Sequence, residues 1–297
     1  MKNKKIILGS RGSKLAIIYA EIAKKEILKF KSDFKFEEIE IKTIKTQGDK
    51  VQDKRLSEVG GKGLFSKKIE ESLLNKEIDI AIHALKDMPS QETPGLKTEC
   101  FLKRNDAREV LISKGGKTLD YLSKGSTIGT SSYRREFQLK MIRKDLDYKL
   151  IRGNVDTRLT KLDNNLYEAI ILSFVGIKFL GLEKKISQVF STSEIIPSAG
   201  QGIIALQCRD DDEMIIEILK KINDMSTFHC AQAERNVLKV LDGDCDTAVG
   251  VFSKIVNNKL NLEAELFSLD GNQRFYEKSE KDISLSSLLG KEVGEKL

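Results

Sequence analysis

Short apolar runs alternate with amphipathic segments through the first 100 residues of the chain. The runs predict strands at 5–9, 36–46, 78–82 and 95–102. Helical spacing of apolar residues predicts helices at 14–30 and 65–75. Alternating strands and helices of this length are typical of an α/β fold, with ligands bound where the strands end.

A second set of alternating elements begins near residue 110. Strands are predicted at 110–113, 126–129, 148–152 and 168–173, each followed by a polar turn or a helix. A later strand at 203–206 and a helix at 211–223 resemble the first set. We therefore expect the chain to cross between two α/β domains twice, near 103–108 and 196–202, as in two-domain ligand clamps. The expected boundaries are 1–102 rejoined by 203–222, and 103–202.

The pattern changes after Ser226. One amphipathic helix is followed by three strands, at 249–255, 260–267 and 273–277. Asn257-Asn258 and Asp270-Gly271 lie between them and are typical hairpin turns. A last helix is expected from residue 283. These elements predict a small antiparallel α+β domain over 223–297.

Composition narrows the class of protein. The chain has 297 residues, 40% of them apolar and 32% charged, which are ordinary values for a globular protein. Its 51 Lys and Arg against 45 Asp and Glu give a net charge of +6, which is compatible with an acidic ligand. No secretory signal and no apolar run long enough for a membrane span is found, so we expect a cytoplasmic protein without a membrane partner.

Cysteine and histidine are too few and too scattered for a metal site. The four cysteines form no Cys-x-x-Cys pair, and only His83 and His229 accompany them. We expect no metal and no disulfide framework. Cys100 and Cys208, in or beside apolar strands, are expected to be buried.

A candidate catalytic residue follows the strand at 78–82, in the stretch His83-Ala-Leu-Lys86-Asp87-Met-Pro89. A carboxylate at a strand end of an open α/β sheet faces the ligand-binding crevice. The alternative is that Asp87 only caps a turn before Pro89. His83 is expected to be a packed or hydrogen-bonded histidine rather than a catalyst.

Arginines occur at three strand-to-helix turns: Arg11, the pair Arg134 and Arg135, and Arg152 with Arg158. A cation near a helix N-terminus costs about 0.3–1 kcal/mol, so repeated placement there suggests an anion bound between arginine and helix. The alternative is that these are surface arginines at helix starts. Ser13 is positioned to cap the helix that begins at residue 14.

A glycine-rich segment, Gly60-Gly-Lys62-Gly63, lies within a polar stretch. It is not a P-loop, because the order of glycines, lysine and hydroxyl residue does not match. We interpret residues 47–64 as a lid over the crevice.

Seven motifs together resemble one family. They are Ser10-Arg-Gly-Ser-Lys-Leu-Ala16, Gly60-Gly-Lys-Gly-Leu-Phe65, His83-Ala-Leu-Lys-Asp-Met-Pro89, Gly129-Thr-Ser-Ser-Tyr-Arg-Arg135, Arg152-Gly-Asn-Val-Asp-Thr-Arg158, Pro197-Ser-Ala-Gly-Gln-Gly202 and Asp242-Gly-Asp-Cys245. In order and spacing they resemble hydroxymethylbilane synthases, also called porphobilinogen deaminases, over essentially the whole chain. Glu58 and Phe179 depart from the residues that relatives place there.

The resemblance implies two domains like type II periplasmic binding proteins, and a third carrying a cofactor-binding cysteine. It also implies a covalently attached dipyrromethane cofactor, to which four porphobilinogen units are added with loss of ammonia. The linear tetrapyrrole is then released by hydrolysis while the primer stays on the enzyme. Porphobilinogen is thus the implied substrate of a transferase in porphyrin biosynthesis.

The resemblance also assigns site residues. Asp87 would be the catalytic carboxylate, and Cys245 would anchor the cofactor through a thioether. Further cofactor contacts would come from Lys86, Asp87, Thr130, Ser132, Arg134, Arg135 and Arg158. Substrate contacts would come from Arg11, Ser13, Lys62 and Arg152.

The arginines suit this ligand. Each pyrrole unit carries two carboxylates, so a six-unit chain brings about twelve negative charges, which arginine pairs can meet in bidentate fashion. Two alternatives are a non-enzymatic anion-binding clamp and a nucleic-acid-binding protein. The latter lacks interleaved aromatic residues, so no nucleic-acid partner is expected. No apolar stripe is left over for a partner subunit, and we expect a monomer.

Overall fold

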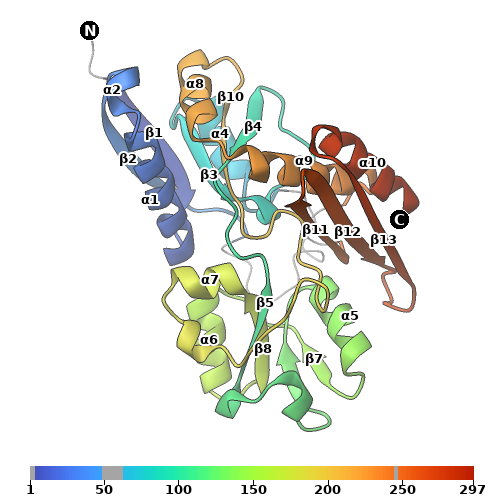
Figure 1. Cartoon of the computed structure of the whole chain (residues 1–297). Coiled ribbons are helices and arrows are strands. Elements are labelled where there is room, and N and C mark those ends of the chain that lie inside the picture. Colours follow the sequence, from blue (N-terminus) through green and yellow to red (C-terminus); the bar gives the residue numbers. More distant parts are fainter. Residues whose placement is uncertain (1–3, 49–62, 244–246) are drawn as a thin grey trace.

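The computed structural model describes residues 4–48, 63–243 and 247–297 (Figure 1). Lys62, Cys245 and nearly all of the expected lid at 47–64 lie outside the described residues. Within the described residues the chain forms three sheets.

The first sheet has the strand order β2-β1-β3-β10-β4. Its strands are β1 (Lys4–Arg11), β2 (Phe36–Ile44), β3 (Ile80–Ala84), β4 (Leu96–Phe101) and β10 (Ile204–Arg209). β1 is parallel to β2 and β3, whereas β10 is antiparallel to β3 and β4. The helices of this unit are α1 (Lys14–Leu28), α2 (Lys31–Phe34), α4 (Lys67–Leu74) and α8 (Glu213–Ile222).

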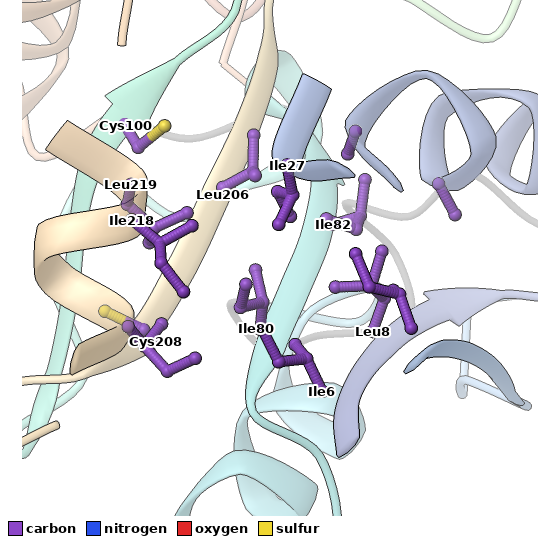
Figure 2. Packing of buried hydrophobic residues seen from close by; sticks show 14 of the residues in the cluster. Ile6, Leu8, Ile27, Ile80, Ile82, Cys100, Leu206, Cys208, Ile218 and Leu219 are labelled. Atoms are coloured by element: carbon purple, nitrogen blue, oxygen red, sulfur yellow. The ribbon is translucent and has the colours of Figure 1, made fainter. Parts of the chain in front are cut away.

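The two faces of this sheet are covered by different helices. Alternate residues of a strand point to opposite faces, so Ile80 and Ile82 pack with α1 and α8 while Ala81 packs with α4. Figure 2 shows the α1 and α8 side of this core, with Cys100 and Cys208 among aliphatic residues. Both cysteines are only 2% exposed, which confirms the expected burial.

The second sheet has the order β7-β6-β8-β5-β9 and lies below the first in Figure 1. Its strands are β5 (Glu109–Ser113), β6 (Thr127–Gly129), β7 (Asp147–Lys149), β8 (Ala169–Ser173) and β9 (Gln188–Val189). Its helices are α5 (Tyr133–Ile142), α6 (Val155–Asp163) and α7 (Phe174–Phe179). Single 3₁₀ turns occur at Lys114–Gly116, Leu119–Tyr121 and Glu183–Lys185.

The C-terminal part is an antiparallel sheet, β11-β12-β13, packed against two helices (Figure 1). The elements are α9 (Met225–Val240), β11 (Val249–Val256), β12 (Lys259–Phe267), β13 (Arg274–Asp282), a 3₁₀ turn at Ile283–Leu285, and α10 (Ser286–Lys296). α10 lies close against α9 because Gly290 has no Cβ, which would overlap the carbonyl oxygen of Ala233. The predicted α/β fold class with a three-stranded antiparallel sheet at the C-terminus is confirmed.

Several strands differ from the sequence-based expectation, β9 was not expected, and β7 and β13 show why strand ends were misplaced. β7 ends at Lys149 rather than residue 152, because its parallel partner β6 ends at Gly129, opposite Lys149. β13 extends to Asp282 rather than residue 277, because β12 provides partners as far as Lys259. In both cases the neighbouring strand sets the limit. None of the helices in the described part of the chain has the length and apolar character needed to span a bilayer.

Candidate active site

Asp87 ends a single 3₁₀ turn, η1 (Leu85–Asp87), that follows β3 directly. Leu85 and Met88 are buried in a cluster with Phe101 and Ile203, and the backbone N–H of Met88 donates to the carbonyl of Leu85. Burying these two apolar residues leaves the residues between them half-buried at the strand end. The Asp87 side chain keeps 32% of its surface exposed, so it is accessible to a ligand.

Arg11 lies beside Asp87 because β1 and β3 are adjacent parallel strands whose C-terminal ends meet at one edge. Arg11 Nη1 is 3.6 Å from Asp87 Oδ2, which is a loose ion pair. The Arg11 guanidinium also stacks 4.0 Å from the centre of the Phe65 ring. Arg11, Phe65, Asp87 and Ser13 line one small pocket of about 50 Å³.

Ser13 is the N-cap of α1, as predicted. Its Oγ accepts a hydrogen bond from the backbone N–H of Ala16 at 3.3 Å. The hydroxyl group therefore stabilises the helix start while lining the pocket beside Asp87. Burial and the negative charge of Asp87 together raise the pKa of Tyr19, another residue of this pocket.

Arg134 and Arg135, in the first turn of α5, both pair with Glu109 at the start of β5. Arg134 Nη2 donates to Glu109 Oε1 at 2.7 Å, and Arg135 donates through Nε at 3.0 Å and Nη2 at 2.8 Å. Burial alone would raise the pKa of Glu109, but Arg135 and Arg134 lower it to about 2. The anion at this helix start is thus a buried carboxylate of the chain itself, and neither arginine is at the surface.

Thr130 and Ser132 shape the turn that leads into α5. Thr130 is fully buried, and its Oγ1 accepts from the backbone N–H of Ser132 at 3.2 Å. Ser132 is the N-cap, and its Oγ accepts from the N–H of Arg135 at 3.5 Å. Both hydroxyl groups therefore hold the turn that carries the two arginines.

Lys86 points towards the second sheet. Its Nζ donates to Gln201 Oε1 at 3.1 Å. Burial and the positive charge of Arg135 lower the pKa of Lys86 to about 8, although Asp87 and Glu109 oppose the shift. The Lys86 ammonium therefore lies in a field shared by both α/β units.

Arg152 and Arg158 flank the start of α6. Arg158 Nε donates to the carbonyl of Gly153 at 2.8 Å. Burial, Arg135 and Arg152 lower the pKa of Arg158 to about 10, and Asp87 partly offsets this shift. Asp87 from the first sheet and these arginines from the second thus belong to one electrostatic cluster.

The cluster fits a ligand with several carboxylates. Burial is the main reason why the pKa values of Lys86 and Arg158 are lowered, and neighbouring arginines lower both values further. Carboxylate groups placed among these side chains would relieve the repulsion and accept charge-assisted hydrogen bonds. The attachment of a cofactor at Cys245 lies outside the described residues.

His83 is a hydrogen-bonded core residue, as expected. Its Nε2 lies 3.2 Å from Gln207 Oε1, and Gln207 Nε2 donates to Glu70 Oε1 at 3.1 Å. Burial lowers the pKa of His83 to about 4. His83 lines the pocket beside Asp87, and its hydrogen bond connects the pocket lining to Gln207 and Glu70.

Two contacts join the α/β units beside the cluster. Phe179 of α7 meets Tyr19 of α1 edge to face, with ring centres 5.6 Å apart. Lys14 Nζ pairs with Asp156 at 2.7 Å. Phe179 therefore serves as an apolar contact between the units.

Sequence reasoning missed the partners of the cationic residues. Glu109 begins an otherwise apolar strand, and this isolated acid was the available signal for a buried ion pair. Glu234 lies on the apolar side of α9 and is fully buried, where Arg104 donates to it. Phe65 and Gln201 gave no signal beyond their presence in motifs.

Two family models cover nearly all of the chain. Residues 6–217 match the model described as porphobilinogen deaminase, dipyromethane cofactor binding domain. Residues 228–297 match the model of the porphobilinogen deaminase C-terminal domain.

The solved structures that match the chain have low sequence identity to it. A Salmonella typhimurium periplasmic binding protein with high arginine specificity has a TM-score of 0.41 and 14% identity, covering 74% of this chain and 91% of that chain. A probable amino-acid ABC transporter extracellular-binding protein from Bacillus subtilis has a TM-score of 0.43 and 12% identity, covering 74% and 90%.

Full-length relatives are much closer in sequence. The porphobilinogen deaminase of Desulforamulus reducens is 41% identical over 99% of this chain and 94% of its own length. The porphobilinogen deaminase of Syntrophomonas wolfei is 40% identical over 98% of this chain and 94% of its own length. The chain belongs to the porphobilinogen deaminase family.

Proposed function

We propose that Asp87 is the catalytic carboxylate of this chain and that the surrounding cations bind the acidic side chains of its ligands. The reaction of the family is that of hydroxymethylbilane synthase, a transferase of tetrapyrrole biosynthesis. It condenses four porphobilinogen molecules, with loss of ammonia, onto a dipyrromethane primer and releases the linear tetrapyrrole by hydrolysis.

One observation carries the proposal: an accessible carboxylate lies within a cluster of cations drawn from two sheets. Asp87 is near enough to Lys86 and Arg158 to oppose the lowering of both their pKa values. Arg11 approaches Asp87 from the end of β1. A negative group in this position can face the nitrogen of a substrate while the cations face its carboxylates.

The dipyrromethane group, when attached at Cys245, supplies the pyrrole position to which substrate is added. Asp87 accepts hydrogen bonds from pyrrole N–H groups and stabilises positive charge that develops as ammonia leaves. Lys86, Arg11, Arg152 and Arg158 hold carboxylates of the substrate and the growing chain.

Several further assignments belong to the same proposal. Arg134 and Arg135 contribute positive charge to the cofactor side of the site while paired with Glu109. Ser13, Thr130 and Ser132 orient the strand ends, and they are proposed as ligand contacts together with Lys62. We also propose three domains, 1–102 with 203–222, 103–202 and 223–297, in a cytoplasmic monomer.

The deciding experiment is the intact mass of freshly purified protein. We expect a mass above that of the sequence by two linked pyrrole units, and we expect Cys245→Ser to lose this increment together with activity. Cys230→Ala, which changes a buried cysteine of α9, is the matched control and should keep the increment.

Two results would contradict the proposal. An active wild type without added mass would exclude Cys245 as the anchor. Binding of small carboxylates without turnover or added mass would instead identify a non-enzymatic clamp.

A further inference from the structure

The two segments that cross between the α/β units lie side by side. The backbone N–H of Asn105 in the first crossing donates to the carbonyl of Gly202 in the second at 2.8 Å. Gly202 has φ +84°, and a Cβ there would lie 2.5 Å from the carbonyl oxygen of Asn105. The close contact therefore depends on glycine at this position.

Gln201, the residue before this glycine, is fully buried and hydrogen-bonded at both ends of its amide. Nε2 donates to the carbonyl of Ala107 in the first crossing at 2.7 Å. Oε1 accepts from Lys86 Nζ at 3.1 Å. A carbonyl accepts only and an ammonium donates only, so the two partners fix the orientation of the amide.

The backbone of Gln201 is held in turn from the C-terminal unit. Arg104 Nε donates to the Gln201 carbonyl at 3.0 Å, and Arg104 Nη1 pairs with Glu234 at 2.5 Å. Glu234, on α9, also accepts from the N–H of Gly200 at 2.7 Å and from Ser253 of β11 at 2.8 Å. These hydrogen bonds fix Gln201 relative to both crossings and to α9, and so they also fix the oxygen that accepts from Lys86.

Lys86 has charged neighbours on α5, on β5 and in its own turn. Arg135 and Arg134 of α5 repel its ammonium, while Asp87 of its own turn and Glu109 of β5 attract it. Its hydrogen bond to Gln201 is to a neutral amide, so the position of the ammonium depends on this oxygen rather than on a tight ion pair.

We propose that Gln201 is a positioning residue that holds the Lys86 ammonium in place and ties it to the two crossings between the α/β units. The inference rests on the proposed ligand-binding role of Lys86. A change in the angle between the units moves both crossings, and through Gln201 it moves Lys86 relative to Asp87.

The test compares Gln201→Met, which removes the acceptor at similar volume, with Gln201→Glu, which adds a charge. Asn105→Ala is the matched control, since it changes a side chain of the first crossing while the backbone contact to Gly202 remains. For each holoenzyme, kcat and KM for porphobilinogen are measured from pH 6 to pH 10. The rate of Lys86 acetylation is followed by peptide mass over the same range.

In the wild type we expect activity and protection from acetylation to fall as pH rises through the pKa of the Lys86 ammonium, which is about 8 without bound carboxylates and higher in the holoenzyme. Gln201→Glu should move both transitions up by at least about one pH unit, because a nearby opposite charge favours the ammonium. Gln201→Met should move them down and raise KM more than it lowers kcat. Asn105→Ala should behave as the wild type.

The inference would be overturned if Gln201→Met kept the wild-type KM and the wild-type pH dependence of activity and acetylation, and only its melting temperature fell. Gln201 would then be a structural residue. Gln201→Met decides the outcome if Gln201→Glu does not fold. Lys86→Met separates the two ideas. Full activity in Lys86→Met would remove the proposed role of Lys86, whereas loss of activity there with unshifted Gln201 variants would overturn the positioning role alone.

Discussion

Of the acid–arginine groups at the strand ends of this molecule, those of Glu109 and Asp87 differ in burial and geometry. Glu109 is fully buried and receives short hydrogen bonds from Arg134 and Arg135, whose side chains are 4% and 9% exposed. Asp87 is 32% exposed and faces Arg11 at 3.6 Å.

The difference separates holding a fold from binding a ligand. The buried Glu109 carboxylate is occupied by two arginines, so the acid itself does not meet a ligand and fixes β5 against α5, while the arginines still contribute positive charge to the site. A half-exposed carboxylate with a loose partner can exchange that partner for substrate groups. The same residue types therefore serve different purposes at the two strand ends.

The largest effect is expected for Glu109→Gln. Removing one charge of a buried group leaves two guanidinium groups uncompensated, which costs about 3–5 kcal/mol. The free energy of unfolding from urea titration at pH 7 measures this loss. A loss below about 1 kcal/mol would show that the group resembles an exposed ion pair.

The pH dependence of stability gives a second check on the same variant. The folded pKa of Glu109 is lowered to about 2 from an ordinary 4.5. Its contribution is therefore complete above pH 4.5 and is lost as pH falls towards 2. The unfolding free energy of the wild type should decrease more steeply over this interval than that of Glu109→Gln, and parallel curves would contradict the assignment.

Asp87→Ala should act on rate rather than stability. Loss of a group that stabilises developing charge lowers kcat about 100- to 1,000-fold, while the melting temperature stays near that of the wild type because Asp87 is half-exposed. Steady-state kinetics and thermal unfolding measure the two quantities. Asp33→Ala, at an exposed aspartate of α2, is the control and should leave both unchanged. Near-normal turnover in Asp87→Ala would remove Asp87 from the mechanism.

Arg11→Lys is expected to have the smallest effect. Lysine keeps the charge opposite Asp87 but loses the planar contact with Phe65, a difference of about 1 kcal/mol. We expect a several-fold decrease in kcat/KM for porphobilinogen. An unchanged value would show that only the charge of Arg11 matters.

The sequence predicted the strands and helices well because their apolar spacing is local. It failed at the ends of β7 and β13, where a neighbouring strand sets the length. The strand-end positions of Asp87 and the arginines were also visible locally. The ion pairs of Arg134 and Arg135 with Glu109 could not be predicted from the sequence. A sequence shows that an arginine needs an anion, but it does not show whether the chain itself provides that anion.

The contact between Lys86 and Gln201 illustrates the same limit over a longer range. The two residues are 115 positions apart, and neither side chain shows by its type that the other is its partner. Only the placement of β10 beside β3 brings the segment of Gln201 next to the turn of Lys86.

That placement of β10 also has a consequence for synthesis on the ribosome. β10 lies between β3 and β4, so the first sheet lacks an inner strand until residue 209 has been made. The second sheet uses only residues from Glu109 to Val189 and is complete earlier. Domains fold as units when their residues become available. The second sheet is therefore expected to reach its native form before the first, because β3 and β4 cannot pair with β10 until β10 has been synthesised.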